Sequence, residues 1–138
     1  MMYMKNSIIL GIILCLTGCV STYYISYDQY GTNIPEYAFT GYIGAECVTT
    51  AIPDSVTSIG KGAYSHCTDL TSITIPIGVT RIDQWAFYGC KALEEIEYEG
   101  SMQQWNLIQK GKDWSKGVKH CIIVCNDGDI VLNWKIGL

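Results

Sequence analysis

Few residues of this 138-residue chain have the types and spacing of a catalytic centre, which needs a nucleophile beside a base, paired carboxylates or a bound metal. His120 adjoins Cys121, but neighbouring residues of a strand point to opposite faces of the sheet, so the two are poorly placed as a catalytic pair. The other histidine, His66, occupies a variable position of a repeat described below. Asp127-Gly128-Asp129 lacks the spacing and the distal glutamate of a calcium loop and is typical of a plain turn. The chain is therefore predicted not to be an enzyme, and to use no cofactor or metal.

The seven cysteines belong to different settings and do not indicate one disulfide framework. Two lie in or directly after an apolar leader, at Cys15 and Cys19. The remaining five are Cys47, Cys67, Cys90, Cys121 and Cys125. Cys67 and Cys90 recur at equivalent repeat positions, so we expect them to be free thiols packed in a core. Cys121 and Cys125 have no second closely spaced pair beside them, which disfavours a zinc site.

The N-terminal segment is apolar between two short polar stretches. Met1–Asn6 contains one lysine, and Ser7–Leu16 reads SIILGIILCL, about the length of the apolar part of a signal peptide and too short to span a bilayer. Leu16-Thr17-Gly18-Cys19 then resembles the lipobox of bacterial lipoproteins. The resemblance implies a signal peptide over residues 1–18 and lipid on the Cys19 thiol, which would anchor the protein to a membrane of the bacterial cell envelope, with exposure on the cell surface left open. The alternatives are an ordinary secretory signal with a chance cysteine and a buried strand.

Residues 19–33 form the expected linker after the acylated cysteine. Val20–Asn33 reads VSTYYISYDQYGTN, which is polar, rich in tyrosine and without a helical or strand period. This segment is interpreted as a linker or as the edge of a cap, and its tyrosines leave open a binding patch over Tyr23–Tyr30.

A 23-residue repeat is the strongest signal in the chain. Ile52–Thr74, IPDSVTSIGKGAYSHCTDLTSIT, aligns without gaps to Ile75–Glu97, IPIGVTRIDQWAFYGCKALEEIE, and a degenerate copy precedes them in Ile34–Tyr42. Nearly all identical positions are apolar or set the backbone, so the repeat preserves a core. The residues expected to be buried are Ile59, Ala63, Cys67, Leu70 and Ile73, with their counterparts Ile82, Ala86, Cys90, Leu93 and Ile96.

The repeat unit IPxxVTxIxxxAFxxCxxLxxIxI resembles the BspA-like subclass of the leucine-rich repeat, and the repeats are placed at residues 34–100. The resemblance implies an α/β repeat fold, a short right-handed solenoid in which LTSITI and LEEIEY stack as parallel strands. SVTSIG would line the opposite wall, and GAYSHC would form a tight helical turn. The residues agree, because Leu70, Ile73 and Ile75 end at Pro76 too soon for a helix and suit a short strand with one buried face.

Residues 101–138 resemble a module that closes arrays of this kind. Ser101 and Gln104 form an S-x-x-Q capping box, which predicts a helix that Gly111 ends. Apolar runs on both sides of Asn126-Asp127-Gly128-Asp129 predict a β-hairpin. The side chains expected to cover the end of the core are Trp105, Ile108 and Trp114.

The charge of the chain disfavours nucleic acid as a partner. After the leader, the chain has eight basic and thirteen acidic side chains, and a phosphate backbone requires a basic footprint. The lysines between Lys110 and Lys119 are the one basic cluster, and they are interpreted as a solvated loop.

Two classes of function remain for such a chain. The family resemblance implies a surface module for adhesion or binding, with a protein or a glycoconjugate as ligand, and the alternative is a structural or assembly lipoprotein of the envelope without an external ligand.

Strand alternation predicts two outward columns of side chains, graded from small and hydroxylated to acidic, at Thr49, Ser72 and Glu95 and at Ala51, Thr74 and Glu97. The hypothesis is that a partner with a basic patch docks there, and the alternative is that these residues are merely solvated.

Overall fold

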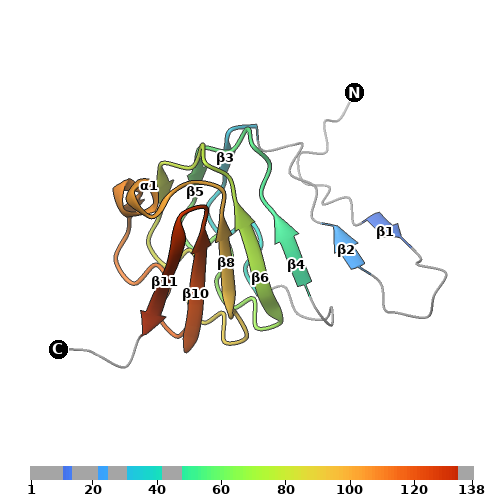
Figure 1. Ribbon diagram of the computed structural model, residues 1–138. Coiled ribbons are helices and arrows are strands. Elements are labelled where there is room, and N and C mark those ends of the chain that lie inside the picture. Colours follow the sequence, from blue (N-terminus) through green and yellow to red (C-terminus); the bar gives the residue numbers. More distant parts are fainter. Residues whose placement is uncertain (1–10, 14–21, 25–30, 42–47, 134–138) are drawn as a thin grey trace.

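The computed structural model describes residues 11–13, 22–24, 31–41 and 48–133, and within them two stacks of parallel strands form the walls of a short solenoid. Figure 1 shows the larger sheet as a row of strands from β11 to β4, with β3 and β5 behind it. The coils that join the two sheets follow the sequence repeat. The predicted short solenoid of parallel strands, with a helix and a hairpin near the C-terminus, is confirmed, although the structure has less helix than an α/β repeat implies.

The larger sheet has five strands in the order β11-β10-β8-β6-β4. Its strands are β4 (Val48–Ala51), β6 (Leu70–Ile75), β8 (Glu95–Tyr98), β10 (His120–Cys125) and β11 (Gly128–Asn133). All neighbours are parallel except β11, which returns antiparallel to β10. Leu70, Ile73 and Ile75 of β6 are buried, as their spacing predicts for a strand with one face on the core.

The opposite wall is a second parallel sheet whose four strands are only two residues long. Its strands are β3 (Asn33–Ile34), β5 (Ser58–Ile59), β7 (Arg81–Ile82) and β9 (Gln109–Lys110). The second residue of each points inward, so Ile34, Ile59 and Ile82 form a buried column in register. The placement of SVTSIG on the wall opposite the leucine strands is thus confirmed.

A third side of the solenoid, here called the turn wall, consists of residues 35–41, 60–67, 83–90 and 111–118. In one coil the amides of Ala63, Ser65 and Cys67 each bond to the carbonyl three residues earlier, at 2.9 to 3.1 Å. Successive coils are also linked, because Tyr64 N donates to Ala86 O at 2.8 Å. The GAYSHC segment is therefore a tight series of turns, as expected, but it is not a helix.

The core between the walls is a set of columns that repeat from coil to coil. Every residue expected to be buried is buried, and Cys67 and Cys90 are free thiols, as predicted. Each thiol donates to a carbonyl of the previous coil, Cys67 Sγ to Phe39 O and Cys90 Sγ to Tyr64 O, both at 3.0 Å. These bonds pair buried polar groups while the aromatic rings of the same coils stack 5.1 to 5.2 Å apart.

The C-terminal segment adds one more coil and then closes the stack. Helix α1 (Met102–Leu107) is inserted between β8 and β9, and the Ser101–Gln104 capping box is present as predicted. The helix ends at a C-cap on Ile108, so the prediction that Gly111 ends it is wrong. The physical reason is pairing, because Gln109 and Lys110 must be extended to continue the second sheet beside β7.

The three side chains predicted to cover the end of the core pack against it. Trp105 and Ile108 are buried and Trp114 is half-buried, and Trp105 lies between Tyr98 and Trp114 at ring distances of 5.3 and 6.0 Å. The predicted hairpin is also present, since β10 and β11 pair on both sides of Asn126 and Asp127.

The basic cluster differs in part from the predicted solvated loop. Lys112, Lys116 and Lys119 are exposed, but Lys110 is half-buried at the end of β9. Its ammonium group donates to Trp105 O and Ile108 O, the carbonyls at the end of α1, and burial lowers the pKa of Lys110. Lys110 therefore caps the helix that covers the core.

Near the N-terminus, β1 (Gly11–Ile13) and β2 (Thr22–Tyr24) pair antiparallel. Cys19, Cys47 and most of the tyrosine-rich segment lie outside the described residues. Among the residues that are described, none belongs to a helix of the length and hydropathy that a membrane crossing requires.

Candidate binding surfaces

The outward columns of the five-stranded sheet have the predicted register. Thr49 pairs with Ser72 and Ser72 with Glu95, while Ala51 pairs with Thr74 and Thr74 with Glu97. Glu95 and Glu97 are exposed, Ser72 and Thr74 are half-exposed, and Thr74 Oγ1 donates to Glu97 Oε2 at 3.0 Å. The side chain of Thr49 lies outside the described part of the structure.

The predicted grading does not stop at the acidic residues. The same column continues onto the hairpin, where Glu95 is beside Ile122 and Ile122 is beside Val131. Ile122 and Val131 are 44% and 66% exposed, so an apolar strip borders the glutamates. Along this column the sheet face thus changes from hydroxylated through acidic to apolar, whereas the other column continues from Glu97 through Val124 to the exposed Asp129. The apolar strip was not predicted, because it becomes outward-facing only when the hairpin joins the sheet in this register.

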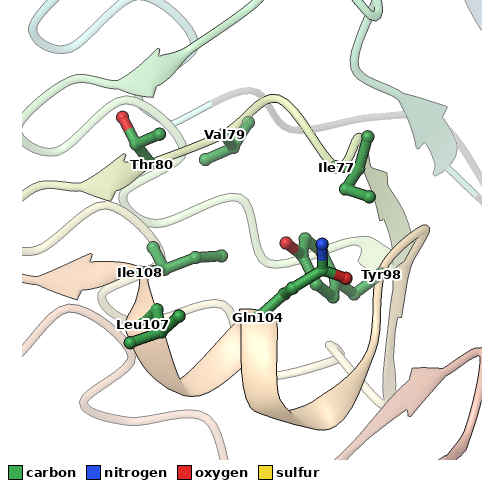
Figure 2. Close-up of a pocket in the computed structure, with 7 residues that line it drawn as sticks. All are labelled: Ile77, Val79, Thr80, Tyr98, Gln104, Leu107 and Ile108. Atoms are coloured by element: carbon green, nitrogen blue, oxygen red, sulfur yellow. The ribbon is translucent and has the colours of Figure 1, made fainter.

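A small apolar groove lies between α1 and the loop that joins β6 to β7 (Figure 2). Ile77 and Leu107 stand on its two sides and are 53% and 75% exposed, and Tyr98 lies at one end. The groove encloses about 160 Å³. Because ligand pockets in proteins enclose roughly 300 to 1,000 Å³, this groove fits no more than one branched side chain of a partner.

A larger pocket, of about 530 Å³, lies on the turn wall. Its lining combines aromatic rings with hydroxyl, imidazole and charged groups, at Tyr37, Thr40, Ser65, His66, Trp85, Tyr88, Asp113 and Lys116. Here this is called the aromatic pocket. Its volume is within the range of small-ligand sites. No motif predicted it, because its residues come from four coils and only their stacking brings them together.

The backbone of the aromatic pocket is unusual because residues other than glycine occupy several of its left-handed positions. Each turn-wall coil has two positions with positive φ, and glycine occupies them at Gly41, Gly62, Gly89 and Gly117. At the other four, the chain has Tyr37, His66, Trp85 and Asp113, with φ between 55° and 61°. A left-handed residue with a side chain costs about 1 to 2 kcal/mol. All four of these residues line the aromatic pocket.

Glycines of neighbouring coils make room for two of these rings. A Cβ atom on Gly62 would overlap the ring of Tyr37, and one on Gly89 would lie 2.9 Å from His66 Nδ1. The His66 ring in turn meets Tyr88 edge-on, with centroids 5.3 Å apart. From the first coil to the third, large side chains and glycines therefore alternate along the turn wall, where the aromatic pocket lies.

The charges around the aromatic pocket nearly cancel. Lys116 Nζ lies 3.8 Å from Asp113 Oδ2, and Lys61 Nζ lies 3.4 Å from Glu36 Oε1. Lys61 also lies over the rings of Tyr37 and Trp85, 5.8 and 5.3 Å from their centroids. A cation thus already lies over each of these two rings.

The groups considered for catalysis lie apart. His120 is exposed while Cys121 is buried, so the two point to opposite faces of β10 as predicted. Burial raises the pKa of Cys121 to about 12, which removes thiolate at neutral pH. Asp127 accepts a hydrogen bond from Met102 N at 2.7 Å, so it ties the hairpin turn to the start of α1. The described residues include no cluster of metal-ligating side chains.

Stacked parallel strands, joined by tight turns around a continuous apolar core, define a repeat solenoid, the class to which leucine-rich-repeat modules belong. The chain belongs to the BspA-type family, because residues 14–107 match the family described as BspA type leucine rich repeat region (6 copies). No curated protein and no solved structure gave a match. Repeats of this family are generally non-catalytic binding modules, typically for proteins.

Proposed function

We propose that this protein is a membrane-anchored lipoprotein of the bacterial cell surface that binds a protein partner through the face of its five-stranded sheet. The observation that carries the binding role is the ordered change across that face. Glu95 and Glu97 are exposed between the hydroxyl groups of β6 and the apolar strip at Ile122 and Val131. Such a face is complementary to a basic patch with an apolar neighbour.

The membrane anchor rests on the sequence, since the apolar leader and the lipobox Leu16-Thr17-Gly18-Cys19 are in register. Cys19→Ala should move the protein from the membrane fraction to the soluble fraction, because the diacylglycerol attaches to that thiol. Mass spectrometry of the mature protein should find Cys19 as an acylated N-terminus. An N-terminus elsewhere, or a Cys19→Ala variant that stays in the membrane fraction, would contradict the anchor.

The sheet face is tested with a charge reversal at Glu95 and Glu97. A partner captured from the cell surface or its surroundings should bind Glu95→Lys/Glu97→Lys much more weakly at low salt, chiefly through a slower association rate. The difference should shrink as salt increases, because exposed charges are screened. The matched control is Glu36→Lys/Asp54→Lys, which changes the net charge equally at exposed positions away from this sheet. Equal binding by both variants would move the protein-binding site elsewhere, first to Tyr23–Tyr30.

Protease treatment of intact cells separates the surface role from that of an assembly lipoprotein inside the envelope. A surface protein is cleaved while the cells remain intact. Full protection until the outer layers are broken would support the structural role.

A further inference from the structure

We propose that the aromatic pocket on the turn wall is a second binding site, for a neutral pyranose ring of a glycan. This site is separate from the sheet face, and the inference does not depend on the membrane anchor or on the protein partner. It rests on three properties of the pocket: strained residues, balanced charge and mixed hydrogen-bonding capacity.

The backbone strain indicates that these side chains have a function. Glycine is the unstrained residue at the left-handed positions of each coil, and this chain uses it at half of them. Tyr37 and Trp85 are bulky residues that break that rule, while His66 and Asp113 are of types that adopt this conformation more readily, and all four line one pocket. Strained residues of this kind cluster at ligand sites, where the side chain is needed despite the backbone conformation.

The charged side chains around the aromatic pocket disfavour some of the ligands that could stack on aromatic rings. A cation would suit the rings and Asp113, but Lys61 already lies over Tyr37 and Trp85, and Lys116 pairs with Asp113. An anion would meet Asp113 and the nearby Glu36. The balanced ion pairs therefore favour an uncharged ligand.

The polar lining selects a ligand that both donates and accepts hydrogen bonds. The Asp113 carboxylate only accepts and the Lys116 ammonium only donates, while the His66 imidazole can do both. The Thr40 hydroxyl donates to Gly62 O at 2.8 Å and can accept a hydrogen bond from a ligand. A proline-rich peptide offers carbonyl acceptors but few donors. The hydroxyl groups of a pyranose do both, and its C–H face is complementary to the negative face of an aromatic ring.

The test is an NMR titration of the purified full chain in detergent micelles. The probes are the methyl glycosides of glucose, galactose, mannose and N-acetylglucosamine, and trisaccharides of the same sugars. We expect at least one glycoside to bind with a Kd of about 1 mM or tighter, and to shift the amide signals of the turn wall and the indole signal of Trp85. The corresponding trisaccharide should bind more tightly.

Glycine substitutions provide variants that should fold, because they place the unstrained residue at a left-handed position. Trp85→Gly should weaken glycoside binding about tenfold or more, since a stacking ring is lost. His66→Gly, which matches Gly41 and Gly89 of other coils, is a second variant with the same expectation. Val131→Thr and Glu95→Lys/Glu97→Lys, on the sheet face, should bind the glycoside as the unchanged chain does.

The proposal is overturned if none of the glycosides or trisaccharides binds. It is also overturned if the pocket instead binds tetramethylammonium, glucuronate or a polyproline peptide, which would make it a cation, anion or peptide site. Glycoside binding that survives both glycine substitutions would place the sugar elsewhere on the chain.

Discussion

The sheet face and the turn wall are built by the same repeat, but they constrain side chains differently. Outward positions of the sheet have extended backbone, which any residue adopts, so Ser72, Glu95 and Ile122 replace one another along one column without strain. On the turn wall two positions in each coil are left-handed, and there glycine is the residue without strain.

The identity of a residue is therefore more informative on the turn wall than on the sheet face. On the sheet face, solubility alone explains exposed acidic residues such as Glu95 and Glu97, so only a binding measurement can show that they contact a partner. On the turn wall, Tyr37 and Trp85 persist at a cost of about 1 to 2 kcal/mol each, so another advantage must offset it.

Substitutions in the core that both surfaces share should change stability the most. Leu93 is 1% exposed beneath the five-stranded sheet, and Leu93→Ala should lower the free energy of unfolding by about 2 to 5 kcal/mol. Urea denaturation followed by circular dichroism measures the change. Glu95→Ala, two residues along the chain but on the outside, should change it by no more than about 0.5 kcal/mol. A Leu93→Ala variant as stable as Glu95→Ala would contradict the burial of this column.

The next effect concerns the thiols beneath the two surfaces. Burial, and then the neighbouring Cys67, raises the pKa of Cys90 under the turn wall from 9.0 to about 12, and burial raises that of Cys121 under the sheet to about 12 as well. The folded chain thus keeps protons that the unfolded chain loses above pH 9. The stability from these thiols is complete below that pH and falls as the pH rises toward 12.

Each thiol should therefore contribute a loss of about 1.4 kcal/mol per pH unit within this window. Cys90→Ala and Cys121→Ala should each remove that slope from denaturation curves measured between pH 9 and 11. Val79→Ala, another buried change without a titrating group, should lower stability by a similar amount at every pH. If only one of the two cysteine variants lost this pH dependence of stability, Cys90 and Cys121 would not be equally buried.

The sequence predicted the core and the sheet register because both follow directly from the repeat. One alignment of 23 residues fixes which side chains recur, and strand alternation then fixes which of them face outward, as at Ser72 and Glu95. The capping box and the hairpin were also predicted, since each depends on residues within a few positions of one another.

The aromatic pocket could not be predicted in the same way. Its residues share no motif, and their left-handed backbone is hidden because Tyr37, His66 and Trp85 are not glycine. One signal was present, the column in which His66 stands where neighbouring coils have Gly41 and Gly89. A residue opposite glycines in an aligned column marks a left-handed position. The end of α1 was predicted wrongly for a similar reason, because the pairing of Gln109 with Arg81 joins two coils and is not visible in the local sequence.

The smallest expected effect is a reversal of sign between the two surfaces. At Trp85, with φ of 61°, the glycine variant should be more stable than the alanine variant by about 1 kcal/mol, because both lack the ring and only alanine keeps the strain. At Glu97, in the extended strand β8, the alanine variant should be the more stable by about 0.5 to 1 kcal/mol, because glycine loses more chain entropy on folding. Comparing glycine with alanine at one position cancels the lost contacts of the original side chain, so each difference reports the backbone alone. Four parallel urea denaturations measure both differences. The same sign at both positions would mean that Trp85 is not strained. Backbone strain would then no longer indicate a ligand in the aromatic pocket.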